Sequence, residues 1–199
     1  MMTQNGYPRA VMLAAIAGSL SLGGCSTNAP GEPSEEQRAE FLSQSQAVTE
    51  RFQSELQTTL ATAIGEVGAV GAIGVCQSAA PAIAQALSEE SGLAVSRIAR
   101  RNRNANGGLP SELEPLYAQL EAAPMDNGAP RKVHGSVEDR MVYLQAIPMK
   151  EQPCSACHGT NIAPAISDAI TEAYPADLAT GFAPGELRGA FLVQERTQP

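Results

Sequence analysis

Aromatic residues are scarce in this chain: Phe, Tyr and Trp together make up 4% of its 199 residues, and Trp is absent. Basic residues are also in the minority, because 13 Lys and Arg stand against 21 Asp and Glu, which gives a net charge of −8. An acidic chain without a basic block lacks the electrostatic footprint of a nucleic-acid-binding protein. Only two His and four Cys are present, so each can be considered individually.

The first 24 residues have the pattern of an export signal. Arg9 is the only charged residue before residue 32, and an apolar run covers residues 10–22. That run is too short for a permanent membrane-spanning helix but fits a signal peptide. It ends in Leu-Gly-Gly-Cys at residues 22–25, which resembles the lipobox of bacterial lipoproteins. The alternative is an ordinary secretory signal with a chance cysteine. We expect cleavage before Cys25, lipidation of Cys25, and membrane anchoring on the periplasmic side, an oxidising compartment.

Residues 25–34 are small and polar, with Pro and Gly, and are expected to form a flexible tether before one domain at residues 35–199. Ser34 with Gln37 predicts a capping box that opens a helix. Apolar residues then return to one helical face: Phe41, Val48, Phe52, Leu56, Leu60 and Ile64. The glycines at 65–71 predict a break, and a second helix should follow, kinked at Pro81.

The rest of the chain alternates strand and helix signals. Apolar alternation predicts strands at residues 93–100, 133–136, 140–147 and 187–194. Short helices are expected at residues 110–122 and 161–174. Long helices first, followed by mostly adjacent strands, predict an α+β domain with an antiparallel sheet.

The chemistry of the chain is concentrated in Cys154-Ser155-Ala156-Cys157-His158. This C-x-x-C-H pattern is the attachment motif of c-type haem, in which two thiols bond to the haem vinyl groups and the histidine binds iron. A thioredoxin-like pair is disfavoured because no βαβ pattern surrounds the motif. A zinc site would need a second pair of ligands, and a plain disulfide would not need the histidine. We expect one covalent haem, whose bulk would also compensate for the missing aromatic residues.

The sixth ligand of such an iron is left open by the motif itself. Cys76 is the one cysteine without an expected role, and it lies on the apolar stripe of the second helix. Its alternative role is that of a small buried apolar side chain. The other candidate ligands are His134, Met125, Met141 and Met149.

Several segments together resemble a known family. They are residues 72–84 around Cys76, the motif with Gly159 and Thr160, and the strings at 174–181 and 185–190. These segments look like the single-haem c-type domain family with a PAS-like fold, over roughly residues 40–195. The resemblance implies long N-terminal helices packed on a PAS-like antiparallel sheet. It also implies that His158 is the proximal ligand and Cys76 the distal ligand. The family's Arg-Asn-Pro-x-Asn loop corresponds here to residues 101–106, which lack the proline.

The expected function is that of a haem-based redox or small-ligand sensor, which would signal through a separate partner protein. The alternative is a lipid-tethered electron-transfer cytochrome c whose acidic surface meets a basic partner. An enzyme is not expected, because the sequence shows no catalytic triad, no metal cluster and no free histidine to act as a base. Asp177 and Glu186 are interpreted as capping groups or as partners of Arg188.

Overall fold

The computed structural model describes residues 32–123 and 129–196. The predicted leader at 1–24, the lipidation site Cys25 and the candidate ligand Met125 lie outside the described residues. So does the predicted tether at 25–34, except for its last three residues. The segment Pro33–Pro199 forms one compact unit, which contains every element described below.

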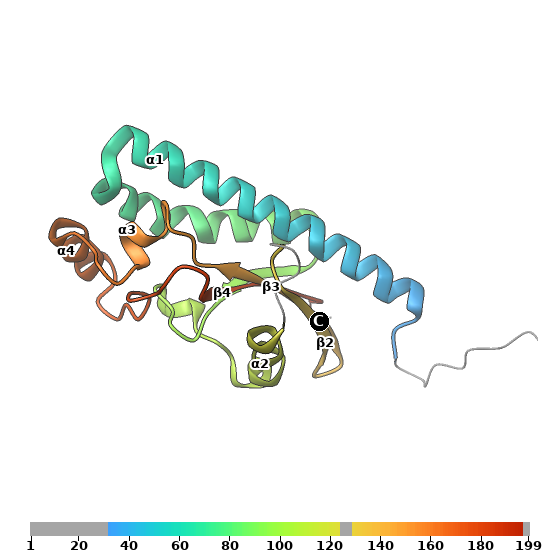
Figure 1. The fold of residues 1–199 in the computed structure, drawn as a ribbon. Coiled ribbons are helices and arrows are strands. Elements are labelled where there is room, and N and C mark those ends of the chain that lie inside the picture. Colours follow the sequence, from blue (N-terminus) through green and yellow to red (C-terminus); the bar gives the residue numbers. More distant parts are fainter. Residues whose placement is uncertain (1–31, 124–128, 197–199) are drawn as a thin grey trace, which may run out of the picture. The chain divides into compact units, whose positions relative to one another are not determined.

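The compact unit begins with a long, bent helix, α1 (Glu35–Ser91). Ser34 opens it with the predicted capping box: its hydroxyl accepts from the Gln37 N–H, and the Gln37 side chain accepts from the Ser34 N–H. Gly68 interrupts the helix with φ 72° and ψ 173°, a conformation that is essentially restricted to glycine. The two segments of α1 therefore run back along each other as a hairpin (Figure 1). Gly92, in the left-handed conformation, ends the second segment.

Four strands form one antiparallel sheet in the order β1-β4-β3-β2. They are β1 (Ala94–Ile98), β2 (Lys132–Val137), β3 (Arg140–Pro148) and β4 (Leu187–Gln194). Glu138 and Asp139 join β2 to β3 with positive φ angles of 51° and 59°, as a type I′ hairpin turn requires. The last strand, β4, pairs with both β1 and β3 and so occupies the interior of the sheet.

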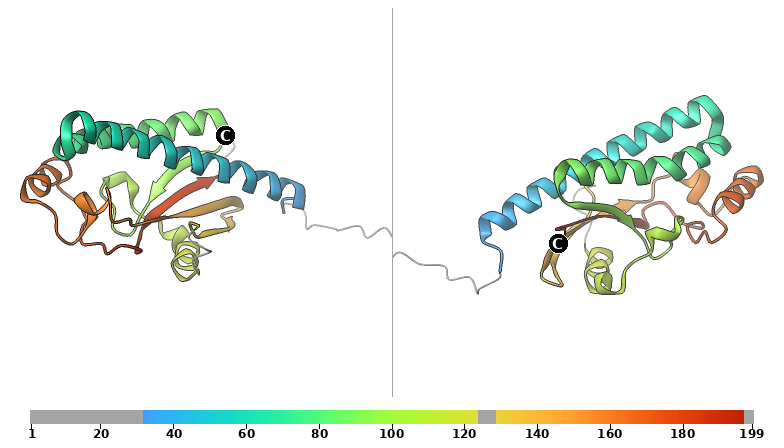
Figure 2. Two further views of the ribbon diagram at one scale, coloured as in Figure 1. Left: turned by 45° about the horizontal axis from the view of Figure 1, so that its top comes forward. Right: turned by 180° about the vertical axis from the view of Figure 1, so that it is seen from behind.

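Helices cover both faces of this sheet (Figures 1 and 2). On one face α1 packs on the strands, and the rings of Phe52 and Phe191 meet with their centroids 5.0 Å apart. On the other face α2 (Glu114–Ala122) buries Tyr117 against a second core that includes Leu144. The sheet thus separates two apolar cores, one under α1 and one under α2.

Two short helices lie at the end of the sheet where β3 finishes. They are α3 (Ser155–His158) and α4 (Pro164–Ala173). The side chain of Gln77 on α1 donates to the Ala173 carbonyl at 3.0 Å, which ties the second segment of α1 to α4. Two 3-10 turns, η1 (Ala105–Gly107) and η2 (Ser111–Leu113), connect β1 to α2. Figure 2 shows α3 and α4 beside the turn of α1 in both views.

The α+β prediction is confirmed, with helices packed on an antiparallel sheet, and β4 spans the predicted residues. The glycine cluster does break the helix, at Gly68. The kink expected at Pro81 is not found. Pro81 lies within helical geometry, and inside α1 Gly68 alone departs from that geometry. A proline removes one backbone hydrogen bond, whereas the angles of Gly68 redirect the whole chain.

Candidate functional site

The cysteines of the C-x-x-C-H motif lie on one tight helical turn. His158 N–H donates to the Cys154 carbonyl at 2.9 Å, and Cys157 N–H donates to the same carbonyl at 3.2 Å. Residues three apart on a helical turn share a side, so the turn presents both thiols together. Cys154 and Cys157 are half-buried free thiols. The two thiols thus project from one side of a single helical turn.

The imidazole of His158 is oriented by a backbone carbonyl. Its Nδ1 lies 2.7 Å from the carbonyl oxygen of Ala179. A carbonyl oxygen can only accept, so in the tautomer that makes this hydrogen bond Nδ1 carries the proton and Nε2 keeps a free lone pair. Burial, followed by the charges of Arg188 and Arg103, lowers the pKa of His158 well below its usual value. The ring is therefore neutral, with Nε2 in the form that binds a metal ion.

A second loop fixes the motif from its other side. Phe182 N–H donates to the His158 carbonyl at 2.9 Å, and Gly181 N–H donates to the Gly159 carbonyl at 2.8 Å. A Cβ atom on Gly159 would lie 2.6 Å from the Ser155 carbonyl oxygen, so no larger residue fits there without a shift. The motif turn is thereby locked to the loop that also supplies the Ala179 carbonyl.

An enclosed ion pair joins the loop after β1 to this arrangement. Arg103 and Asp177 make two contacts of 3.1 Å, and their side chains are only 12% and 8% exposed. Arg103 also donates to the Cys157 carbonyl at 2.6 Å. Asp177 in turn accepts from the Ala179 N–H at 2.9 Å. Asp177 was interpreted as a capping group or as a partner of Arg188; it does cap the Ala179 N–H, but its ion-pair partner is Arg103.

Cys76 lies half-buried on the second segment of α1, beside the motif. Burial raises the pKa of its thiol, the charge of Arg97 lowers it, a negative charge on Cys157 would raise it, and Arg103 lowers it. These mutual influences place the Cys76 thiol within electrostatic range of Cys157, Arg97 and Arg103, in one region of the molecule. The cysteine on the helix and the cysteine of the motif are thus brought together from positions 81 residues apart in the sequence.

Arg97 adds a positive charge near Cys76 that no described carboxylate pairs with. It lies on the α1 face of β1, two residues after the core residue Val95, with its guanidinium carbon 6.0 Å from the ring centroid of Phe52. Its side chain is exposed, yet burial lowers the pKa of its guanidinium. The side chain therefore keeps exposed surface while many protein atoms surround its guanidinium. Within the described residues Arg97 has no carboxylate partner.

The other candidate ligands lie elsewhere or are packed. His134 is exposed on the outer strand β2 and pairs with Tyr143. Tyr143 is five residues before the end of β3, about 17 Å along the strand from the motif end at 3.4 Å per residue. Met141 is buried in the core under α1. Met149 is buried with Ala179 and Phe182, and Cys154 packs against this group.

The remaining carboxylate of the predicted pair, Glu186, also has a structural role. It accepts from the Ala183 N–H at 2.8 Å and so closes the turn before β4. Asp177 faces Arg103 instead. The two carboxylates therefore stabilise different parts of the α4–β4 connection and have different partners.

A four-stranded antiparallel sheet under a helical hairpin, with a cysteine–histidine turn at its end, defines a PAS-like α+β domain. The chain belongs to the Tll0287-like family, whose profile (Tll0287) matches residues 29–195. Among solved structures it is similar to the crystal structure of the cyanobacterial heme-protein Tll0287, with a TM-score of 0.60 and 20% identity. The likeness covers 84% of this chain and 99% of that chain. No curated protein matches the chain.

The sequence pattern located the cysteines and His158 but not the side chains that hold them. Arg97, Arg103 and the Ala179 carbonyl were not singled out. One signal was available, because an arginine at the inward position of a strand of otherwise apolar inward residues breaks the alternation. A charged side chain at such a position indicates a role other than core packing.

Proposed function

We propose that the chain binds one haem covalently, with Cys154 and Cys157 as its thioether links and Nε2 of His158 as the proximal ligand of iron. One observation carries this proposal: the contact between Nδ1 of His158 and the Ala179 carbonyl leaves Nε2 as the free nitrogen. Metal-binding histidines characteristically donate their other N–H in this way. The relative of known structure is described as a heme-protein, which agrees with the proposal.

The residues present suit such a group. The thiols of Cys154 and Cys157 are free, and the His158 ring is neutral. Arg97 adds a cation within electrostatic range of Cys76, and it has no carboxylate partner in the part of the chain that the structure describes. A haem carries two propionate groups, and a guanidinium pairs well with a carboxylate. We assign Arg97 as a partner of a haem propionate.

We propose Cys76 as the distal ligand, on the side of the bound group away from His158. Support comes from its place on α1, where the thiol is half-buried and lies within electrostatic range of Cys157. The hydrogen bond from Gln77 to Ala173 holds this turn of α1 in position next to α4. His134 is less suitable, because it lies exposed on the outermost strand.

When bound, a haem supplies a one-electron couple between ferric and ferrous iron. A thiolate ligand would lower the potential of that couple, because it donates electron density to iron. We propose that the protein is a redox or small-ligand sensor, exported and anchored through Cys25, which acts through a partner protein. The alternative of a tethered electron carrier is favoured by the charge balance, since an acidic chain suits a basic redox partner.

Covalent attachment is tested by staining for haem peroxidase activity after denaturing electrophoresis. The wild-type band should stain, and the double variant Cys154→Ala/Cys157→Ala should not. Cys76→Ser is the matched control, because it also removes a half-buried thiol of this site but no attachment point, so its stain should persist. A stain that survives in the double variant would exclude the assignment.

The two functions are separated by the reactivity of the ferrous protein. A sensor should bind CO or NO with a spectral change and should have a low midpoint potential. A carrier should instead exchange electrons rapidly with a soluble cytochrome and leave CO unbound. Fast electron exchange without CO binding would therefore refute the sensor.

A further inference from the structure

A separate cavity lies at the α2 side of the sheet. It has a volume of about 340 Å³ and is lined by Arg100, Arg101, Arg131, Arg188, Tyr117 and Phe182, among others. Tyr117 belongs to the core under α2, and the guanidinium carbon of Arg100 lies 5.2 Å from its ring centroid. The cavity, which we call the arginine pocket, is large enough for a small organic molecule.

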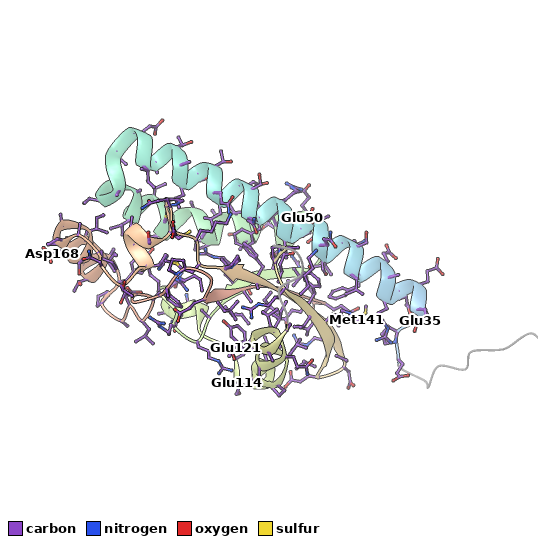
Figure 3. The ribbon with its side chains drawn as sticks, viewed as in Figure 1. Glu35, Glu50, Glu114, Glu121, Met141 and Asp168 are labelled. Carbon is purple, nitrogen blue, oxygen red and sulfur yellow. The ribbon has the colours of Figure 1, made fainter. Side chains whose placement is uncertain are left out.

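The arginine pocket carries an excess of positive charge. Its four arginines face two lining carboxylates, Glu121 and Glu186. Arg100 is paired with Glu114 and Glu121, which both project from α2 (Figure 3). Arg101, Arg131 and Arg188 are left without an ion pair among the described residues, and Glu186 accepts from a backbone N–H. An anion is therefore the ligand that this lining favours.

Arg131 leaves a hydrogen-bond donor unused in the pocket wall. Its Nη1 donates to the Glu121 carbonyl at 2.8 Å, whereas its Nε is buried and has no partner in the described chain. A buried donor without an acceptor is costly. That Nε has almost no exposed surface, so a carboxylate in the pocket would pair with the terminal nitrogens of this guanidinium, which has no carboxylate partner among the described residues.

Arg188 connects the arginine pocket to His158. Its Nε lies 3.2 Å from Nδ1 of His158, and its Nη1 donates to the Arg101 carbonyl at 3.2 Å. Nδ1 cannot donate to Ala179 and accept from Arg188 at once. If His158 binds iron through Nε2, as the proposed function requires, Nδ1 carries the proton and Arg188 loses that acceptor. An anion in the pocket would replace it.

We propose that the arginine pocket binds a small free carboxylate, and that Arg188 couples its occupancy to the iron behind His158. The aromatic rings of Tyr117 and Phe182 would cover the apolar body of the ligand, and the guanidinium groups would hold its carboxylates. A negative charge near iron stabilises the ferric form, which is the more positive one. By linkage, the ferric protein must then bind the anion more tightly than the ferrous protein.

Binding is tested by calorimetry of the haem-loaded protein with succinate, and with inorganic phosphate as a tetrahedral comparison. Succinate should bind, and Arg131→Met should weaken it by about tenfold or more through loss of a charged hydrogen bond. Arg131→Lys keeps the charge but lacks the fork of parallel N–H groups. Its affinity for succinate should therefore lie between those of the wild type and Arg131→Met. Arg140→Met is the control, since Arg140 pairs with Glu138 at the β2–β3 turn and does not line the pocket. Equal binding by wild type and Arg131→Met would overturn the pocket, and so would preference for phosphate.

The coupling is tested by repeating the titration with ferrous protein. We expect about fivefold weaker binding, within the usual range of linkage between sites. A tenfold ratio would equal a fall of about 59 mV in midpoint potential for a one-electron couple. Equal affinities would overturn the coupling.

The haem-free variant Cys154→Ala/Cys157→Ala separates this proposal from the proposed function. If the haem-free variant binds succinate and the haem-loaded wild type does not, a haem propionate fills the pocket. That result would overturn the proposal of a free carboxylate ligand. If haem staining fails but succinate still binds through Arg131, the pocket stands without its link to iron.

Discussion

Asp177 shows how one side chain can hold a functional site without touching its reactive atoms. It pairs with Arg103, which donates to the Cys157 carbonyl, and it accepts from the N–H of Ala179, whose carbonyl orients His158. One carboxylate thus supports both the cysteine turn and the histidine ring. Removing the Asp177 carboxylate should therefore lower the free energy of unfolding and also disturb the site.

Asp177→Asn should destabilise the protein by about 3–5 kcal/mol, because it leaves Arg103 enclosed without a counter-charge. Chemical denaturation of the haem-loaded protein measures this loss. Glu138→Gln is the comparison, since it breaks the more exposed pair with Arg140 and should cost less than about 1 kcal/mol. Equal losses of stability in the two variants would show that the enclosed ion pair contributes no more than the exposed one.

Cys76→Ser tests the distal ligand. The ferric spectrum should change from low-spin to high-spin, or to that of a substitute ligand, and the midpoint potential should rise because a thiolate donor is lost. Absorption spectroscopy and redox titration measure both effects. If the ferric spectrum is unchanged in Cys76→Ser but altered in His134→Ala, the ligand is His134.

The site residues that could be predicted from the sequence are those whose expected role follows from the residue types themselves and their near neighbours in the chain. Cys154, Cys157 and His158 form a contiguous motif, and Cys76 stood out as a cysteine with no other expected role. Arg103 and Asp177 are 74 residues apart, and only the closure of two loops brings them together. No spacing rule connects such positions, so the supporting side chains became visible only in the folded chain.

Among the elements, the turn of α3 depends on a residue with no side chain. Gly159 follows His158 directly and lies against the Ser155 carbonyl. This close approach lets the chain leave the turn and meet the loop at Gly181. The geometry of the cysteine–histidine turn therefore rests on the absence of one methyl group.

Gly159→Ala should destabilise the protein by about 1–3 kcal/mol, because the added Cβ would lie 2.6 Å from a backbone oxygen. Thermal and chemical unfolding measure the change. Gly74→Ala is the matched control, since a Cβ there meets nothing within 4 Å and lies in a helix. That variant should be neutral or stabilising by up to about 1 kcal/mol. A neutral Gly159→Ala would contradict the close approach.

The bounds of helices and strands were more predictable from the sequence than the position of the bend in α1. Apolar alternation located β4 at its observed bounds, and the Ser34–Gln37 pair marked the start of α1. The sequence predicted both a break at the glycine cluster and a kink at Pro81 within the same helical stretch. Backbone angles place the bend at Gly68, whose conformation other residues rarely adopt.

At the scale of the whole molecule, Cys25 is expected to connect the domain to a membrane. Cys25→Ser should leave an uncleaved precursor and abolish partitioning into a detergent phase, because a lipid chain can no longer be attached. Immunoblotting of the detergent and aqueous phases measures both. A variant that partitions like the wild type would show that the chain is not held by this lipid.

The first segment of α1 has a consequence for reach. From Glu35 to Val67 it comprises 33 residues, which at 1.5 Å per residue make a rod about 50 Å long. With a lipid at Cys25, this rod begins ten residues from the bilayer, and α3 lies toward its far end (Figure 1). The helix therefore separates the first residue of the domain from the cysteine–histidine turn by most of the length of this rod.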